Sequence, residues 1–399
     1  MKFVIPNHFP LEGSGSGIYT QNVALELTRM GHEVCVITPE HSQLRGYPYE
    51  VRNILFSNGE NQEASLPFNF PCFTTHPVSS NTFENLSDEE IKIYVDTFQK
   101  TIDRAVADIS PDLMHVQHLW VATFCASRTG VPYVATVHGT DLMGYEKDAR
   151  YRAMAEQGAE KAEKIISISS QITDKTQSIY GVPDSKIATI LNGFSTDIFH
   201  IMDSVDREDI FTEFSIPPAE KLICFVGKLT EFKGIDVLIR AAAIYEKELG
   251  SAATLIIGMG ELREELHRLV SDLGLEHVHF IGHQPQTAVA RINNAADLSV
   301  FPSRVEPFGL VAIEALACGT PVVTTNRGGF PDFINDNVGR MVDVDSHTQL
   351  AQAVIEEITS DAKLNKGPYA AEYAAGGFSW KKKVKEFCTI YEHAAGSPQ

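Results

Sequence analysis

The stretch LSVFPSRVEPFGLVAIEALACGTPVVTT, residues 298–325, decides the fold. It begins with a short apolar run at 298–301, continues with a mostly apolar segment of helical length after Gly309, and ends with the β-branched run 321–325. A short apolar run and a β-branched run that flank a helical segment are typical of a β-α-β unit. Because the two strands of such a unit lie parallel, the sequence predicts a parallel sheet in this region.

The same alternation extends over most of the chain. It pauses at Asn192-Gly193, a turn signal followed by a polar stretch to residue 220. We therefore predict an α/β protein with two facing, doubly wound, Rossmann-like parallel-sheet domains and a cleft between them. The amino-terminal domain is expected over residues 1–195 and the carboxyl-terminal one over 196–378, with the helical segment 379–399 a candidate to pack back on the first. Strands are predicted at residues 3–5, 34–38, 113–116, 133–138, 165–168, 187–191, 222–226, 254–257, 279–281, 298–301 and 321–325, and helices at 18–30, 148–163 and between the other strands.

Length, charge and cysteine content limit the class of protein. The 399 residues suit two domains of roughly 100–200 residues each. The net charge, 33 − 52 = −19, disfavours a general nucleic-acid partner. No apolar run reaches the ~20 residues of a membrane-spanning helix, and the first residues are too soon interrupted for a signal peptide. The six cysteines lie far apart without a Cys-x-x-Cys pair. We therefore expect a soluble, cytoplasmic protein; the sequence does not indicate its oligomeric state.

Three loops that follow predicted strands carry candidate binding groups, because ligands of parallel sheets bind at the carboxyl ends of the strands. Gly13-Ser14-Gly15-Ser16-Gly17 follows the first strand. Its spacing is not the dinucleotide fingerprint, so a flexible turn and a close approach to phosphate both stay open. Lys228 and Lys233 follow the first strand of the second domain. These two lysines can converge on a diphosphate, or they can be solvated surface residues.

The third loop contains two carboxylates, Glu306 and Glu314, around the start of the helix in the quoted stretch. Glu306 can accept hydrogen bonds from sugar hydroxyls, or it can simply complement the helix dipole. Glu314 has apolar neighbours, which is unusual for a solvated carboxylate. Unpaired helix amides can hold a phosphate or sugar oxygen; the candidates are those of Phe308, Gly309, Leu310 and Val311.

These motifs, taken in order, resemble the family 4 retaining glycosyltransferases of the GT-B type. The resemblance rests on the two glutamates with seven residues between them, the Ala-Cys-Gly-Thr-Pro-Val-Val that follows, and Gly-Gly-Phe-Pro-Asp at 328–332. The lysine loop resembles the family's diphosphate loop, and His138 with Gly-Thr-Asp141 resembles its active-site histidine loop. The match covers nearly the whole chain. Lys228 departs from it, since the family usually has arginine there, and lysine lacks arginine's bidentate fork.

The resemblance implies a role for each matching residue. His138, Glu306, Lys228 and Lys233 would form the catalytic group, with His138 at the reacting centre, Glu306 on the donor sugar and the lysines on the diphosphate. The implied donor-binding residues are Gly15 behind the diphosphate, Gly282 and His283 beside the base, the amides of Phe308, Gly309, Leu310 and Val311, and Glu314 on the ribose.

The acceptor side is expected in the first domain, beside the polar loop 56–90, whose aromatic residues favour a packed loop next to a site. His118 lies just past its strand and can line the cleft, and Asp141 belongs to the histidine loop. Arg150 and Arg152 can meet an acidic acceptor, although the alternative of a solvated helix start with mixed charge is favoured. The net charge of −19 is also compatible with a cationic acceptor.

The expected reaction is transfer of a sugar from a nucleotide-diphosphate sugar, UDP favoured, to a hydroxyl of a small-molecule or glycan acceptor, with retention and without a required metal or other cofactor. A metal-binding role for Asp343-Val344-Asp345 is rejected, because capping of the next helix explains it. A zinc site at His115 and His118 is rejected on spacing. The alternatives are a nucleotide-sugar epimerase, a phosphorylase, a dinucleotide oxidoreductase and a non-catalytic nucleotide-sugar-binding protein.

Overall fold

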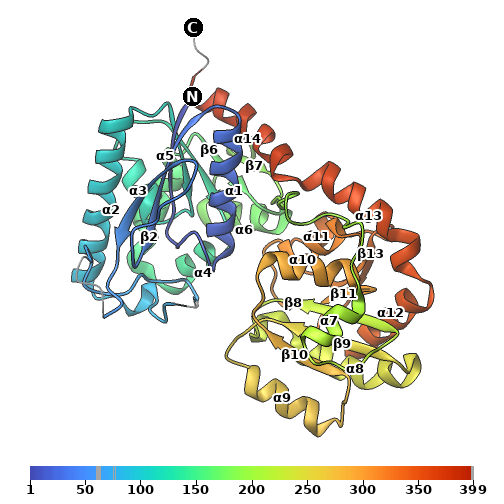
Figure 1. Ribbon diagram of the computed structural model, residues 1–399. Coiled ribbons are helices and arrows are strands. Elements are labelled where there is room, and N and C mark those ends of the chain that lie inside the picture. Colours follow the sequence, from blue (N-terminus) through green and yellow to red (C-terminus); the bar gives the residue numbers. More distant parts are fainter. Residues whose placement is uncertain (60–63, 75, 77, 397–399) are drawn as a thin grey trace. The chain divides into compact units, whose positions relative to one another are not determined.

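The computed structural model describes residues 1–59, 64–74, 76 and 78–396, which form two compact units (Figure 1). The first unit holds residues 1–192 together with the carboxyl-terminal segment from residue 380, and the second unit holds residues 193–379. The chain therefore leaves the first unit at Asn192, three residues before the predicted boundary, and returns to it at Trp380.

The first unit is built on a seven-stranded, all-parallel sheet of order β3-β2-β1-β4-β5-β6-β7. The strands are β1 Lys2–Pro6, β2 Glu33–Glu40, β3 Glu50–Leu55, β4 Leu113–Gln117, β5 Tyr133–Val137, β6 Lys164–Ser167 and β7 Ile187–Thr189. The helices are α1 Gly15–Arg29, α2 Asp88–Ile109, α3 Val121–Ala126, α4 Thr140–Lys147, α5 Arg152–Lys161, α6 Ser170–Tyr180 and α14 Trp380–Ala394. Helices α2, α3 and α5 pack together on one face, and α1 and α14 pack on each other (Figure 1).

The second unit repeats this plan with a six-stranded, all-parallel sheet of order β10-β9-β8-β11-β12-β13. The strands are β8 Lys221–Val226, β9 Ala252–Ile257, β10 Val278–Gly282, β11 Leu298–Phe301, β12 Val322–Thr325 and β13 Gly339–Val342. The helices are α7 Arg207–Glu213, α8 Ile235–Leu249, α9 Arg263–Asp272, α10 Gln286–Ala295, α11 Leu310–Ala317, α12 His347–Thr359 and α13 Ala362–Phe378. Helix α8 packs with α12, and α11 packs with α10 and α13, so both units are Rossmann-like, as predicted.

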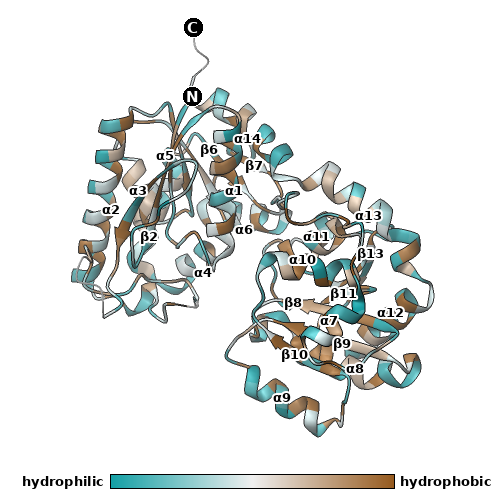
Figure 2. Cartoon of the chain, viewed as in Figure 1, coloured by the Kyte–Doolittle hydropathy of each residue, from teal (hydrophilic) through white to brown (hydrophobic). Residues whose placement is uncertain are grey.

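Apolar residues concentrate on the strands of both sheets, whereas the outer helices are apolar on one side and polar on the other (Figure 2). All six residues of β9 are buried, as in a strand covered on both faces. The strand β3 was not predicted, because Glu50, Arg52 and Asn53 make this edge strand too polar for an apolar-run criterion. The strand β13 was also not predicted, because its sequence Gly-Arg-Met-Val is short and its charged Arg340 interrupts any apolar run.

Two helix predictions need correction. The helix predicted at 18–30 begins earlier, at Gly15, because the Ser14 hydroxyl accepts a hydrogen bond from the Gly17 amide and caps it. The single helix predicted at 148–163 is wrong. Asp148 is extended and ends α4, its side chain accepts from the Arg150 amide, and α5 begins only at Arg152. A carboxylate that bonds its own backbone two residues ahead competes with the helix.

The segment 56–90 is a packed loop in its described part, and α2 begins within it at Asp88. Phe70, Phe73 and Phe83 are buried. The Phe73 ring lies 5.3 Å from the ring of His118, so the loop does border the candidate acceptor residue. Residues 60–63, 75 and 77 of this prediction lie outside the described residues.

Candidate active site

Each sheet has one point at which the strand order reverses. In the first unit this point lies between β1 and β4, and in the second between β8 and β11. Connections from such neighbouring strands run in opposite directions and leave a crevice at the carboxyl ends, where ligands of open α/β sheets bind. The predicted site residues follow these strands or their neighbours, so each unit carries its own group of candidate site residues.

In the second unit the two loops at this point are joined to each other. The amides of Arg304 and Val305 donate to the carbonyl of Phe232, which lies in the short 3₁₀ helix Glu231–Lys233. Gly234 has a φ of 63°, and a Cβ at this position would overlap the carbonyl oxygen of Pro302. Only glycine suits both the left-handed backbone and this close approach. The lysine loop is therefore held against the glutamate loop.

This contact brings Lys233 and Glu306 together. The Lys233 ammonium lies 2.6 Å from Oε2 of Glu306, and the Ser303 hydroxyl donates to the same oxygen at 3.3 Å. Glu306 is buried and Lys233 is about one-quarter exposed. The sequence suggested two lysines that face a diphosphate together. In the structure Lys233 pairs with Glu306, the proposed sugar-binding carboxylate, and its contact with a diphosphate stays a prediction. A short, mostly desolvated ion pair fixes both groups in place.

The start of α11 presents unpaired backbone donors beside Glu306. Gly309 caps the helix in a left-handed conformation, with a φ of 104°, and Phe330 packs where its side chain would be. Within the described residues, the amides of Phe308, Gly309, Leu310 and Val311 have no backbone acceptor. Four free amides at a helix start favour an anion or a sugar oxygen.

One turn further on, Glu314 is 8% exposed, and no hydrogen bond or ion pair of its carboxyl group is found within the described residues. Burial raises its pKa to about 8. A buried carboxyl group without a partner costs stability, and a ligand hydroxyl would supply that partner.

Lys228, Gly282 and His283 lie at the same edge of this sheet. The amide of Gly227 donates to the carbonyl of Ile257, and the amide of Gly258 donates to that of Gly282, so the loops after β8, β9 and β10 are tied in series. Lys228 and His283 are exposed. These three residues are therefore placed along this edge of the sheet.

In the first unit, His138 lies in a buried polar cluster after β5. Its Nε2 lies 2.9 Å from Oε1 of Gln117, the last residue of β4. Its ring lies 4.6 Å from the ring of His118 and 5.0 Å from that of Tyr19. Burial, with smaller effects from His118 and His115, lowers the pKa of His138 well below its ordinary value. The ring is therefore neutral at physiological pH.

The carboxylate of Asp141 accepts hydrogen bonds from the backbone of this cluster. Its Oδ1 accepts from the amides of His138 and Gly139 at 3.2 and 2.9 Å, and its Oδ2 accepts from the amide of Leu119 at 3.0 Å. Asp141 is fully buried, and these contacts satisfy its carboxylate. They give Asp141 a structural role, because they hold the loops after β4 and β5 together; the suggested acceptor contact stays a prediction.

His118 is the least satisfied polar residue of the cluster. It is 1% exposed and has a φ of 69°, a conformation that non-glycine residues rarely adopt. Neither ring nitrogen has a hydrogen-bond partner among the described residues, and Nδ1 stays 3.9 Å from Asp141. Backbone strain and unpaired polar groups tend to gather at functional sites, which keeps His118 a candidate for the acceptor side.

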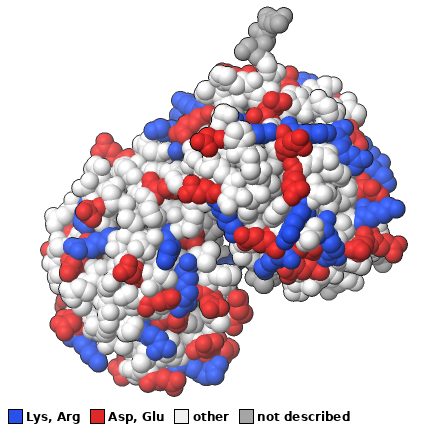
Figure 3. All heavy atoms as spheres, turned by 180° about the vertical axis from the view of Figure 1, so that it is seen from behind, with Lys and Arg blue, Asp and Glu red and all other residues white. Residues whose placement is uncertain are grey.

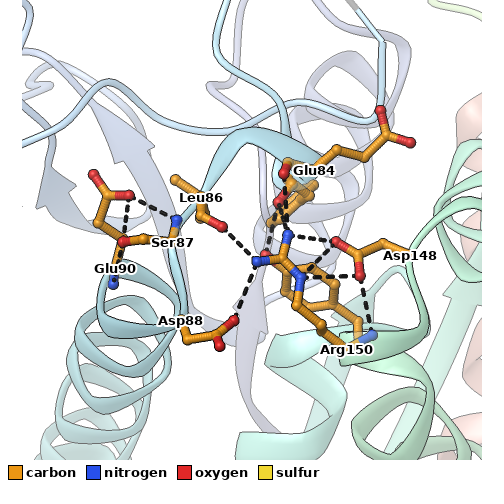
Figure 4. A network of polar contacts seen from close by, with 9 residues as sticks. Glu84, Leu86, Ser87, Asp88, Glu90, Asp148 and Arg150 are labelled. Atoms are coloured by element: carbon orange, nitrogen blue, oxygen red, sulfur yellow. Dashed lines mark hydrogen bonds and ion pairs between the residues drawn. The ribbon is translucent and has the colours of Figure 1, made fainter.

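Arg150 and Arg152 are committed to other contacts. Arg150 bonds both oxygens of Asp148, the carboxylate of Asp88 and the carbonyls of Phe83, Glu84 and Leu86, which uses all its donor groups (Figure 4). Arg152 donates to the carbonyls of Tyr145 and Glu146 at the end of α4. The suggested acidic-acceptor contact is thus not supported, because both guanidinium groups already join loops and helix ends.

The residues suggested and rejected as a metal site have ordinary partners. Asp343 accepts from Asn326 and Gln349, Asp345 pairs with Arg304, and the Ser346 hydroxyl caps α12. In the described portion of the chain, no group of three or more His, Cys, Asp or Glu side chains is placed to hold a metal ion, and no helix is long and apolar enough to span a membrane.

Sequence reasoning missed Gln117, Tyr19 and Ser303. Gln117 carried a weak signal, because it is a polar residue at the carboxyl end of a buried strand. Tyr19 and Ser303 carried none, since an aromatic residue in an amphipathic helix and a serine in a loop are common.

The glycine loop of the first unit offers a matched pair of variants. A Cβ on Gly17 would overlap the carbonyl oxygens of Pro10 and Leu11, whereas a Cβ on Gly15 would meet nothing within 4 Å. Gly17→Ala should therefore lower the free energy of unfolding by about 1–3 kcal/mol. Gly15→Ala should change it by less than about 0.5 kcal/mol, yet reduce turnover, because the diphosphate is predicted to lie against Gly15. Urea unfolding and initial rates check both; equal destabilisation, or full turnover of Gly15→Ala, would contradict the assignment.

Comparison with known proteins agrees with this geometry. Residues 13–198 match the model of Glycosyltransferase Family 4, and residues 206–373 match that of Glycosyl transferases group 1. An uncharacterised glycosyltransferase of Methanocaldococcus jannaschii is 30% identical over 95% of this chain and 94% of its own. The D-inositol 3-phosphate glycosyltransferase of Mycolicibacterium smegmatis is 29% identical over 96% of this chain and 87% of its own.

Among solved structures, Anabaena HepE in complex with UDP superposes with a TM-score of 0.74 at 18% identity, over 98% of this chain and 100% of that one. The fold is that of the GT-B glycosyltransferases. The chain belongs to the family 4 glycosyltransferases.

Proposed function

We propose that this glycosyltransferase uses a nucleotide-diphosphate sugar, with UDP as the favoured nucleotide, and transfers its sugar with retention of configuration. The observation that carries the proposal is the Lys233–Glu306 pair, 2.6 Å apart, at the switch point of the second sheet and beside the free amides of α11. A cation, a carboxylate and a row of amides suit a diphosphate joined to a polyhydroxylated ring. HepE, which shares the fold, was solved with UDP.

The proposed step breaks the bond between the anomeric carbon and the β-phosphate oxygen, and forms a bond from the same carbon to the acceptor oxygen. The departing phosphate oxygen takes the acceptor proton on the same face of the sugar. Positive charge develops on the ring as in other glycosyl cleavage, and the carboxylate of Glu306 lies ready to hold the sugar hydroxyls. Lys228, Lys233 and the α11 amides stabilise the leaving diphosphate without a required metal, and Glu314 binds the ribose.

The first unit is proposed to handle the acceptor, with His138 at the reacting centre. Several relatives are D-inositol 3-phosphate glycosyltransferases, so a phosphorylated cyclitol is one acceptor to test. Lys, Arg, Asp and Glu are interspersed over the face drawn in Figure 3. On that face the net charge of −19 therefore gives no acidic patch that would select a cationic acceptor.

Calorimetric unfolding with UDP, GDP, ADP or dTDP, each with EDTA, tests the donor class. A nucleotide at 100 times its Kd should stabilise the protein by about 2.7 kcal/mol if it binds only the folded state. Calorimetry is preferred to fluorescence, because both tryptophans, Trp120 and Trp380, lie in the first unit. We expect UDP to raise the unfolding temperature. A rise that requires Mg²⁺ or Mn²⁺ would contradict metal-independent binding. No rise with any nucleotide or nucleotide sugar would contradict the proposal as a whole.

An epimerase remains the second candidate, because Glu306 and the α11 amides would hold the sugar of a nucleotide sugar equally well without an acceptor. Incubation of UDP-sugars with and without an acceptor library, including inositol phosphate, separates the two. A transferase releases UDP in step with a glycosylated acceptor, whereas an epimerase changes the sugar and releases no UDP.

A further inference from the structure

The carboxamide of Gln117 can be oriented from its two contacts. Its Nε2 lies 3.5 Å from the carbonyl oxygen of His115, and its Oε1 lies 2.9 Å from Nε2 of His138. A carbonyl oxygen can only accept a hydrogen bond, so the amino end of the carboxamide belongs on the His115 side. The opposite orientation would place two oxygens face to face. Gln117 therefore presents an acceptor to His138.

This acceptor determines where His138 carries its proton. Because Oε1 of Gln117 cannot donate, the hydrogen bond requires the proton on Nε2 of the imidazole. A neutral ring protonated at Nε2 has its lone pair on Nδ1. Among the described residues the hydrogen bonds of His138 involve its amide and Nε2 and none involves Nδ1, so this lone pair is available to a ligand.

Tyr19 also helps to hold the imidazole ring of His138 in this orientation. The Tyr19 ring meets it edge-on, with centroids 5.0 Å apart and planes at 89°. Tyr19 is itself held in place. Its hydroxyl lies 3.2 Å from that of Thr136 on β5, and the Trp380 ring packs against the Tyr19 ring with centroids 5.0 Å apart. Gln117 and Tyr19 are fully buried, so neither can relax into solvent.

We propose that Gln117 is a positioning residue, which fixes His138 as the Nε2-protonated tautomer and thereby presents Nδ1 as an acceptor to a ligand hydroxyl. The catalytic consequence rests on the proposed role of His138 at the reacting centre. The assignment of the tautomer does not depend on that role, since it follows from contacts within the first unit.

The test uses the full chain with ¹⁵N-labelled histidine. Long-range ¹H–¹⁵N spectra distinguish the two tautomers, and loss of one spin system in His138→Asn identifies the signal of His138. We expect the wild-type ring to be protonated at Nε2. In Gln117→Leu the Nε2 proton loses its acceptor, so we expect a mixture of tautomers and a kcat that falls roughly 10- to 100-fold. The KM for the nucleotide sugar should change less than about threefold.

Gln117→Glu supplies a second variant that keeps the acceptor. Its carboxylate should stabilise the doubly protonated ring, which removes the lone pair on Nδ1. Turnover should then be low near neutral pH and recover as pH rises, a change that a merely structural role of Gln117 would not produce. The other titratable groups facing the ring, His118, His115 and Tyr19, are the same in the wild type, whose profile is the reference.

Tyr391→Phe is the matched control, because it breaks a comparable hydrogen bond of another buried histidine, His115, which lies on β4 with Gln117. The Tyr391 hydroxyl lies 2.7 Å from Nδ1 of His115. This variant should lower the unfolding midpoint but leave the His138 tautomer and kcat unchanged. A wild-type His138 protonated at Nδ1, or a Gln117→Leu variant with wild-type tautomer and kcat, would overturn the proposal. Full turnover of His138→Asn would overturn the proposed role of His138 alone, because the spectrum still decides the tautomer.

Discussion

Glu306→Gln should lower kcat by about 100- to 1,000-fold, while the Kd for the free nucleotide changes less than about threefold. The carboxylate accepts from Lys233 at 2.6 Å and from Ser303 at 3.3 Å in a mostly buried position. It is therefore a fixed negative charge, and its effect is greatest when the sugar carries positive charge in the transition state. The amide of glutamine keeps the size of the side chain and removes the charge.

Initial rates with a saturating donor, together with calorimetric titration of the nucleotide, measure the two effects. Glu357→Gln is the control, because Glu357 is another buried carboxylate of the second unit, paired with Lys366 at 2.8 Å and Arg340 at 2.7 Å. It should lower stability and leave the kcat of the folded protein near that of the wild type. An equal loss of nucleotide affinity and kcat in Glu306→Gln would show that the carboxylate acts in ground-state binding instead.

The predictable part of the fold is the part in which local sequence and burial agree. Strands such as β9 and β11 are covered on both faces, so their residues are all buried and mostly apolar, and they are visible as runs. Edge strands β3 and β13 expose polar residues and depend on a neighbouring strand for their conformation. No window of the local sequence contains that neighbour, so such strands escape a sequence criterion.

The candidate site divides in the same way. Charged residues that follow strands could be picked out, because the carboxyl edge of a parallel sheet collects them. The contacts between such residues could not be predicted, because the partners are far apart in the sequence. Lys233 contacts Glu306, 73 positions away, and Gln117 contacts His138, 21 positions away. Arg150 shows the same limit: besides Asp148, two positions away, its partners lie at 83–88, more than 60 positions away.

Acidification from pH 7 to pH 5 should destabilise the first unit relative to the second. His8, His115 and His138 are buried, and burial lowers the pKa of each, that of His115 to about 3. In the unfolded chain a histidine has a pKa of about 6.5. Below that pH the unfolded state binds more protons, so stability present above pH 6.5 is lost as pH falls. Three such groups contribute about 4 kcal/mol per pH unit.

One carboxyl group of the first unit opposes this effect. Glu40 accepts from the Leu11 amide at 3.2 Å, and burial raises its pKa to about 7. Its folded form binds a proton that the unfolded form does not, so the net excess in the unfolded state is 3 − 1 = 2 protons. Integrated from pH 6.5 to pH 5, the first unit loses about 3 kcal/mol, a large share of a typical total of about 5–15 kcal/mol.

The second unit should respond in the opposite direction. Burial raises the pKa of Glu314 to about 8 and that of Glu246 to about 7. Their folded forms bind protons above the unfolded pKa, so stability rises as pH falls from these values toward about 4.3. The half-buried His279, whose pKa burial lowers, opposes them only in part. The two units should therefore separate on acidification, the first losing stability while the second holds it.

The positions of the two tryptophans make this separation measurable. Trp120 and Trp380 are both buried in the first unit, and the second unit contains no tryptophan. Urea unfolding at pH 7 and pH 5, followed by tryptophan fluorescence and by far-UV circular dichroism, reports the first unit and the whole chain respectively. At pH 5 the fluorescence midpoint should fall well below the later part of the dichroism transition. Neutral buried histidines take up protons only when the first unit unfolds. Coincident fluorescence and dichroism curves at pH 5 would therefore contradict this assignment, as would a fluorescence midpoint that is the same at both pH values.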